Sequence, residues 1–168
     1  GVFFVSGNHE IYSHSASWIE EVRSWGWIPL INQHRLIERS GYKIAIGGIP
    51  DRQSGRLTGD PEPSVMQAFM GAPTAQHAAR VLLAHQPIQA REVQGYEIAL
   101  QLSGHTHGGQ IWPFHGLIPL QQPILSGLAR VGDVLVFTSR GAGFWGPPMR
   151  LFAPAEVPVL ILRSRPGS

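Results

Sequence analysis

The side chains best suited to chemistry near the start of the chain are an amide, an imidazole and a carboxylate in a row, Asn8, His9 and Glu10. They come directly after the apolar run 2–5 and a Ser-Gly pair. An apolar run that stops on ligand-capable residues is typical of a strand whose carboxyl end borders a binding site. The same residues could also form a plain turn, since asparagine and glycine both favour turns.

Two further apolar runs end in the same way. One ends at His85, and the other is followed by His105 and His107 within a Gly-His-Thr-His-Gly-Gly motif. A lone histidine at a strand end is more often structural than a ligand, but two imidazoles between glycines are a poor choice for a core. Ligands collect beyond the carboxyl ends of the strands in open α/β sheets, so the strand ends should meet in one cleft. The residues expected there are Asn8, His9, His85, His105 and His107.

Composition limits the chemistry that is available to such a cleft. The chain has 168 residues, 43% hydrophobic and 14% charged, which suits a single domain. It has no cysteine, so a metal would be held by imidazole, carboxylate, amide and water. The net charge of +2 comes from scattered residues and forms no basic stripe for nucleic acid, and it does not exclude a small phosphate ester as a ligand. No run approaches the ~20 apolar residues of a membrane helix.

Alternating strands and helices are expected to position these residues in one α/β domain over 1–168. Apolar runs predict strands over 2–6, 80–85, 98–102, 134–141 and 157–163. A hairpin is predicted over 35–49, with its turn at Ser40-Gly41. The segments 51–63 and 108–130 are predicted to be loops.

Two helices are predicted from the spacing of apolar residues. The first spans 17–25, with Trp18, Val22 and Trp25 on its apolar face and Gly26 as its end. The second is short and follows residue 63, with Val65, Met66 and Phe69 on its apolar side. The remaining histidines are expected at the surface, and they are His14, His34, His77 and His115.

Three motifs resemble those of one known family. Gly-Asn-His-Glu at 7–10, Ala-His-Gln-Pro around His85 and Ser-Gly-His-Thr-His-Gly-Gly-Gln-Ile at 103–111 resemble the calcineurin-like metallophosphoesterases in order and approximate separation. The segments 104–114 and 139–163 resemble the bacterial, often membrane-associated phosphohydrolase branch. The resemblance implies a portion of a β-sandwich flanked by helices, and a parent protein associated with a membrane.

The resemblance also implies roles for individual residues around two divalent metal ions. The matching metal ligands are Asn8, His85 and His105 for one ion and His107 for the other. His9 matches the residue that protonates the leaving group or stabilises negative charge, and Glu10 is expected to orient it and favour its protonated form. Imidazole, carboxylate and amide ligands suit Mn, Fe or Zn better than Ca or Mg.

The family's opening motifs, Asp-x-His and a Gly-Asp at the end of a strand that carries a metal-bridging aspartate, have no match in the chain. Asp51 and Asp60 lie in a polar loop without strand context, and Asp133 precedes a late strand. The chain also begins with Gly1 inside an apolar run. We therefore expect the C-terminal portion of a longer enzyme, truncated at its N-terminus, whose first strand lacks cover and recruits a second copy of the chain.

The function expected of the parent is metal-dependent hydrolysis of phosphomonoesters or phosphodiesters. A metal-activated hydroxide would attack phosphorus, with His9 as acid or charge stabiliser. Two alternatives remain. One is a fragment that folds or binds without catalysis, because the carboxylates for the first metal are absent. The other is a histidine metalloenzyme of another fold, such as a cupin, whose His-x-His lies inside a β-barrel.

Overall fold

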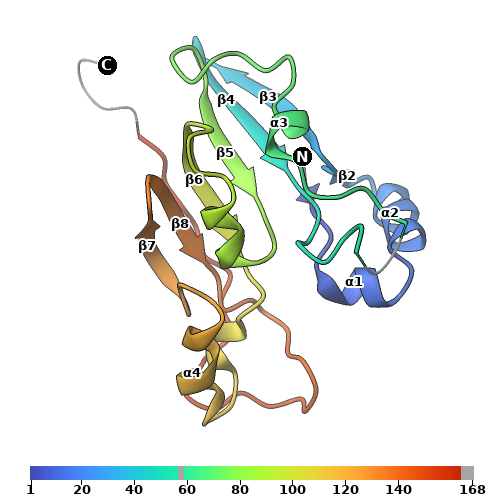
Figure 1. The fold of residues 1–168 in the computed structure, drawn as a ribbon, viewed down its shortest axis with the longest axis vertical. Helices are drawn as coiled ribbons and strands as arrows, with labels where there is room; N and C mark the ends of the chain where they lie inside the picture. Colours follow the sequence, from blue (N-terminus) through green and yellow to red (C-terminus); the bar gives the residue numbers. More distant parts are fainter. Residues whose placement is uncertain (57–58, 164–168) are drawn as a thin grey trace.

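The computed structural model describes residues 1–56 and 59–163, and its centre is a six-stranded sheet in the order β3-β4-β5-β6-β8-β7 (Figure 1). The strands of this sheet are β3 (Gln33–Arg39), β4 (Tyr42–Gly48), β5 (Ala79–Leu83), β6 (Ile98–Ser103), β7 (Gly127–Val131) and β8 (Val134–Thr138). A second, two-stranded sheet pairs β1 (Phe3–Phe4) with β2 (Ile28–Pro29). The predicted α/β class, with helices flanking the sheets, is confirmed.

Four neighbouring strands, β4, β5, β6 and β8, run parallel, so their carboxyl ends meet at one edge of the sheet. The outer strands are antiparallel. β3 forms the predicted hairpin with β4 through Ser40 and Gly41, which both have positive φ, and β7 pairs with β8. An open mixed sheet of this kind is not the closed double-sheet barrel of a cupin.

The two faces of the six-stranded sheet are covered to different extents. One face carries Ala45, Leu82, Val134 and Val136, which are fully buried against α3 (Val65–Ala68) and the 3-10 helix η1 (Pro87–Arg91). On the other face, Leu83, Leu102 and Phe137 are only half-buried. The two-stranded sheet approaches this second face at Gly48, where a Cβ would collide with Leu30 and would lie 2.7 Å from Val5.

Two helices lie between β1 and β2 in the chain, α1 (Asn8–Tyr12) and α2 (Ser15–Ser24). The helix predicted over 17–25 corresponds to α2, and Gly26, with a φ of +78°, follows the end of α2. Only Val22 of the predicted apolar face is buried, while Trp18 and Trp25 are exposed. Their indole N–H groups donate hydrogen bonds at the surface, to Ser13 Oγ and Glu21 Oε1, instead of packing inward.

The second predicted helix is the single turn α3. Val65 and Phe69 are buried as predicted, but Met66 is 64% exposed. The buried set is Val65, Ala68 and Phe69, which are spaced i, i+3 and i+4, and Met66 falls one position outside this stripe.

Several expected strands and loops differ from the structure, among them the predicted strand 134–141, which ends at Thr138. The first strand covers two residues rather than five, and the segment 108–130 contains η2 (His107–Gly109), α4 (Phe114–Leu117), η3 (Ile118–Leu120) and β7. Residues 157–163 form no strand and take part in none of the strand pairs of the described residues, and Val157 and Val159 are 82% and 86% exposed. The loop 51–63 agrees with the prediction, although 57 and 58 lie outside the described residues.

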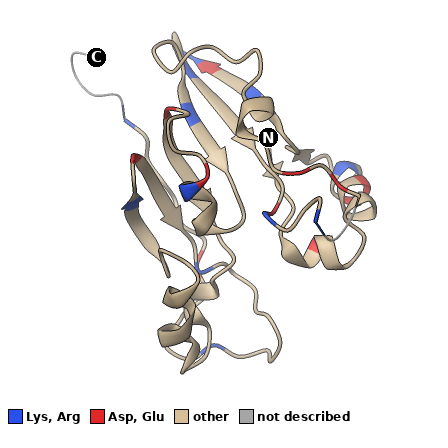
Figure 2. Ribbon diagram, viewed as in Figure 1, with Lys and Arg blue, Asp and Glu red and all other residues tan. Residues whose placement is uncertain are grey.

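Charged residues are spread over the fold without a continuous basic stripe, as Figure 2 shows. In the described part of the chain, none of the helices combines the length and apolar character that a membrane crossing requires.

Candidate metal centre

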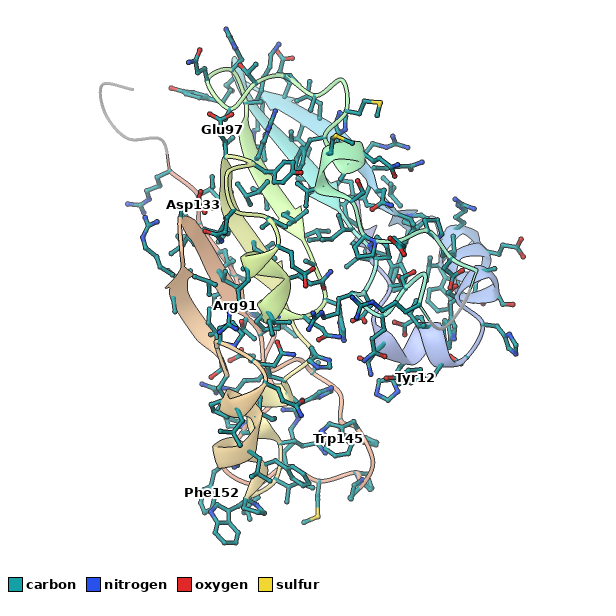
Figure 3. All side chains as sticks on the ribbon, in the orientation of Figure 1. Tyr12, Arg91, Glu97, Asp133, Trp145 and Phe152 are labelled. Atoms are coloured by element: carbon teal, nitrogen blue, oxygen red, sulfur yellow. The ribbon has the colours of Figure 1, made fainter. Side chains whose placement is uncertain are left out.

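The predicted ligands meet at the edge of the sheet where the parallel strands end. Asn8 is the first residue of α1, and His85 and His105 each lie two residues beyond the end of their strands, β5 and β6. All three line one pocket of about 240 Å³, together with His9 and His107. In the view of Figure 3, Trp145 lies on the same side of the molecule, between α4 and Tyr12 of α1.

Three ligand-capable atoms in this pocket form a tight triangle. Asn8 Oδ1 lies 3.0 Å from His85 Nε2 and 3.1 Å from His105 Nδ1, and the two ring nitrogens are 3.3 Å apart. Ligands that share one ion at ~2.0–2.2 Å are themselves separated by about 3.0–3.5 Å. If both rings donated a proton to the amide oxygen, their two N–H groups would crowd each other, whereas a shared cation uses all three lone pairs.

The donor set is therefore two imidazoles and one amide. Within the described residues, no group of three or more His, Cys, Asp or Glu gathers as a metal cluster, so the third donor here is the oxygen of Asn8. Two nitrogens and one oxygen fit a borderline divalent ion such as Mn, Fe or Zn.

The electrostatic environment keeps these rings neutral. Burial, followed by the neighbouring His105, His107 and His9, lowers the pKa of His85 to about 3. Burial also lowers the pKa of His105, where Asp51 acts in the opposite direction. The pKa of His107 is lowered by burial and then by the Arg150 guanidinium. Neutral imidazole is the form that coordinates a metal, so the rings are prepared for binding near neutral pH.

These lowered pKa values predict that the metal-free chain loses stability in acid. Above the ordinary histidine pKa of ~6.5, His85 is neutral in both the folded and the unfolded chain. Between ~6.5 and about 3 the unfolded chain binds a proton that the folded chain does not, so stability falls as pH falls. The slope is up to ~1.4 kcal/mol per pH unit for one proton.

Urea unfolding in the presence of a chelator, at about pH 7.5 and about pH 5, measures this loss. A His85→Gln variant removes the titrating ring, and its free energy of unfolding should change less between the two pH values. An identical change in the two proteins would contradict a buried neutral His85.

The lack of a side chain at Gly7 leaves room for the His85 ring. A Cβ at position 7 would lie 2.8 Å from both Cε1 and Nε2 of His85. The Gly7 N–H donates to the Glu10 carboxylate at 2.6 Å, which closes the first turn of α1. Glu10 thus stabilises α1 instead of orienting His9, and that expectation is wrong. The His9 ring packs edge-on against Tyr12, with 6.1 Å between the ring centroids.

A Gly7→Ala substitution should weaken the metal site without removing a ligand. The added Cβ displaces the His85 ring, and the loss of orienting contacts around a ligand typically costs about 10–100-fold in metal affinity. The matched control is Gly104→Ala, since a Cβ there meets no atom within 4 Å. Titration of both variants with Mn by calorimetry measures the difference, and equal affinities would show that the Gly7–His85 contact is unimportant.

The segment that carries His105 and His107 is strained and firmly held. Both residues have positive φ, 68° and 51°, which is uncommon outside glycine and is often found at functional sites. Thr106 Oγ1 between them donates to the Leu125 carbonyl at 2.6 Å. Arg150 Nη1 donates to the His107 carbonyl at 3.1 Å, and its Nη2 lies 3.4 Å from His107 Nδ1. His107 therefore lines the pocket beside the triangle of Asn8, His85 and His105 and is held by Arg150.

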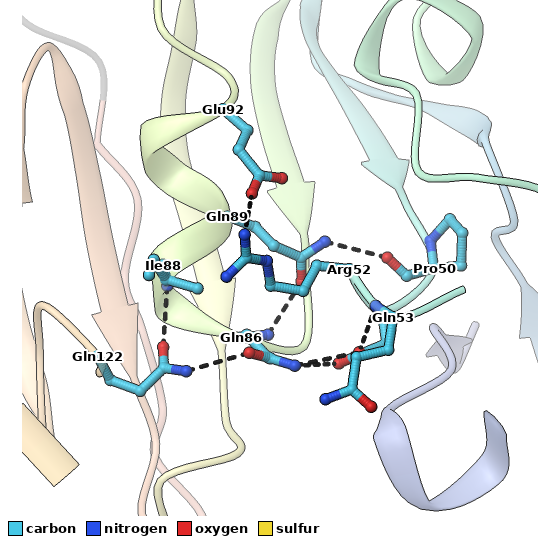
Figure 4. A network of polar contacts seen from close by, with 9 residues as sticks. Pro50, Arg52, Gln53, Gln86, Ile88, Gln89, Glu92 and Gln122 are labelled. Carbon is cyan, nitrogen blue, oxygen red and sulfur yellow. Dashed lines mark hydrogen bonds and ion pairs between the residues drawn. The ribbon is translucent and has the colours of Figure 1, made fainter. Parts of the chain in front are cut away.

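The expectation that Asp51 lies in a polar loop without strand context is wrong. Asp51 lies three residues beyond the end of β4, at the same edge as His85 and His105, and it is 0% exposed. Its two oxygens accept from Gln86 Nε2 at 3.0 and 2.9 Å, and one also accepts from the Gln53 N–H at 2.9 Å (Figure 4). The carboxylate thus fixes Gln86, the neighbour of His85, and it does not line the metal pocket.

The four remaining histidines were all expected at the surface. His14 and His77 are exposed, whereas His34 and His115 are half-buried. His34 Nδ1 lies 2.8 Å from the Ala68 carbonyl, a structural contact, and His34 does not line the pocket.

Comparisons with curated proteins place this geometry in context. The chain is 37% identical over 167 residues to an uncharacterized metallophosphoesterase of Campylobacter jejuni, covering 98% of this chain and 43% of that protein. It is 35% identical to an uncharacterized metallophosphoesterase of Helicobacter pylori, covering 96% and 42%. A transmembrane protein with metallophosphoesterase domain from Danio rerio is 33% identical, covering 97% and 39%.

The chain thus spans about two fifths of the length of these relatives, since it covers 43%, 42% and 39% of them. A solved structure of a sulfate thiohydrolase, SoxB, overlaps 66% of this chain and 20% of its own, with 24% identity and a TM-score of 0.42, too little to support an argument. No family model matches the chain.

Proposed function

Because the chain belongs to the calcineurin-like metallophosphoesterase family, we propose that its parent protein hydrolyses phosphate esters with divalent metal ions bound in the pocket of Asn8, His85 and His105. The observation that carries this proposal is the triangle of 3.0–3.3 Å among one amide oxygen and two ring nitrogens. Mn, Fe and Zn all suit such ligands.

The residues of the pocket would have two roles, metal binding and proton donation. Asn8, His85 and His105 would hold one ion, and His107, which lines the same pocket, would be a ligand of the second. Bound ions of this kind supply a water of lowered pKa and stabilise negative charge on phosphoryl oxygens. His9 lines the same pocket with an exposed side chain, so it can reach the leaving group and donate a proton to it.

Part of the pocket lining is apolar, since it includes Phe114, Ile118 and Trp145. Phe114 and Trp145 form an edge-to-face pair with centroids 5.6 Å apart, and Ile118 lies beside them. This part of the lining suits the organic part of a small phosphate ester, because aromatic side chains give a large apolar contact area.

The proposal is tested with the full-length gene product and a nitrophenyl phosphodiester. We expect hydrolysis with added Mn, loss of hydrolysis in a chelator, and recovery when Mn is restored. The chain 1–168 alone should bind Mn weakly and turn over little, because it has no Asp-x-His and neither of its Gly-Asp pairs, 59–60 and 132–133, lines the pocket. Binding without turnover in the full-length protein would favour the alternative of a non-catalytic binding module.

The parent protein is proposed to be membrane-associated. Relatives from Danio rerio and Bos taurus are named transmembrane proteins with a metallophosphoesterase domain. Fractionation of cells that express the full-length gene product tests this, and recovery only in the soluble fraction would contradict it.

Self-association of the chain through its first strand is also proposed. Val2 is 50% exposed, and among the described residues β1 pairs only with β2, so its other edge is available to a second copy. We expect the sedimentation coefficient of the chain to rise with concentration, and a Val2→Lys variant to reduce that rise. Concentration-independent sedimentation of the unmodified chain as a monomer would contradict the proposal.

A further inference from the structure

A second hollow, of about 480 Å³, lies beside the metal pocket and carries three arginines, Arg52, Arg56 and Arg91. Gln121 and Gln122 line both the hollow and the metal pocket, so the two are contiguous. Two of the arginines come from the loop after β4, and Arg91, labelled in Figure 3, ends η1.

The charges of this arginine hollow are only partly compensated. Arg52 Nη2 lies 3.1 Å from a Glu92 carboxylate oxygen. Within the described residues, the ion pairs include none to Arg56 or Arg91. Asp51 is buried behind Gln86 and Gln53, which donate hydrogen bonds to it. Three guanidinium groups and no carboxylate line the hollow, so its lining is positively charged.

The carboxamides between the two cavities are held in fixed orientations (Figure 4). Gln122 Oε1 accepts from the Ile88 N–H at 3.1 Å, and Gln122 Nε2 donates to Gln86 Oε1 at 3.1 Å. Gln86 in turn donates to Asp51, as described above. Binding in the hollow therefore needs little ordering of its floor, which lowers the entropic cost of association.

We propose that the arginine hollow binds a second phosphate group on the same substrate whose ester is hydrolysed in the metal pocket. This inference rests on the proposed function and names its substrate class: a small phosphate ester whose organic part carries another phosphate. A guanidinium group matches the oxygens of a phosphate with two parallel hydrogen bonds. A polymer of phosphates is disfavoured, since the charges form no stripe beyond the hollow.

The first test measures binding without catalysis. The chain is titrated with ethyl phosphate by calorimetry in a chelator, so that the metal pocket does not recruit the anion. Arg56→Gln and Arg91→Gln should each weaken binding by about 10-fold, the effect of a hydrogen bond to a charged group. Arg35→Gln, an exposed arginine of β3 outside both cavities, is the control. No binding, or an equal loss in the control, would overturn the inference.

The second test measures selectivity in the full-length gene product with Mn. The substrates are the 4-nitrophenyl phosphodiesters of ethanol and of 2-phosphoethanol, and water displaces nitrophenolate from both. We expect a higher kcat/KM for the phosphorylated substrate, and a fall of at least about 10-fold in this preference in Arg56→Gln and Arg91→Gln.

The outcomes of the two tests separate the two proposals. If neither substrate is hydrolysed, the proposed function fails, and the binding test alone decides the inference. If both are hydrolysed equally, the function stands and the inference fails. A stronger preference for an oligonucleotide than for the phosphorylated substrate would also overturn the inference and would assign the hollow to nucleic acid.

Discussion

A His105→Ala variant is expected to lose at least about 100-fold in Mn affinity and nearly all hydrolysis in the full-length gene product. His105 Nδ1 lies within 3.1 Å of Asn8 Oδ1 and 3.3 Å of His85 Nε2, so its removal opens one side of the triangle. Loss of a residue that only orients a ligand costs about 10–100-fold in affinity, and loss of the ligand itself should cost more.

Equilibrium dialysis against Mn measures the affinity, and a nitrophenyl phosphodiester reports hydrolysis. The matched control is His77→Ala, which removes an exposed imidazole from another part of the chain. Wild-type affinity in His105→Ala would exclude His105 as a ligand. An equal loss in His77→Ala would point to a general effect on folding.

A His9→Ala variant of the full-length gene product should lower turnover of esters with poor leaving groups by about 10²–10⁴-fold, the usual worth of a positioned acid. His9 lines the pocket but takes no part in the triangle of Asn8, His85 and His105, so Mn affinity should be preserved. The loss of turnover should shrink for nitrophenolate, a leaving group that needs little protonation.

Rates on an alkyl phosphodiester and on its nitrophenyl analogue, measured with saturating Mn, give this comparison directly. His14→Ala, an exposed histidine just beyond α1, controls for the loss of a ring near the site. An equal loss on both substrates would argue against proton donation and leave stabilisation of negative charge as the role of His9.

The convergence of Asn8, His85 and His105 could be predicted because each follows an apolar run that becomes a strand. The parallel pairing of β5 with β6 then fixes both histidines at one edge of the sheet. Apolar runs and turn glycines are local signals, and for the same reason the hairpin of β3 and β4 was predicted correctly.

The signals that failed depend on contacts far along the chain. Residues 157–163 read as a strand because they are apolar, but a strand also needs backbone hydrogen bonds to a partner strand, and these residues take part in none of the strand pairs of the described residues. Trp18 has the right spacing for a buried helix face, yet its indole finds a hydrogen bond to Ser13 at the surface. Spacing alone does not say how wide the contact between a helix and a sheet will be.

The position of Asp51 at a strand end was not predicted, although it also follows an apolar run. It follows the apolar run of β4 as His85 follows that of β5, but Pro50 and the polar loop after it obscured the pattern. Its partner Gln86 gives no sign of burial in the sequence, since a buried glutamine is recognisable only from its hydrogen bonds. The role of Glu10 was misjudged because a helix that begins at Asn8 places a capping carboxylate at that position.

The central claim is that Asn8, His85 and His105 share one metal ion, and X-ray diffraction from Mn-soaked crystals at the Mn absorption edge tests it most directly. The account predicts an anomalous peak at ~2.0–2.2 Å from Asn8 Oδ1, His85 Nε2 and His105 Nδ1. A peak elsewhere in the protein, or none at saturating Mn, would contradict it.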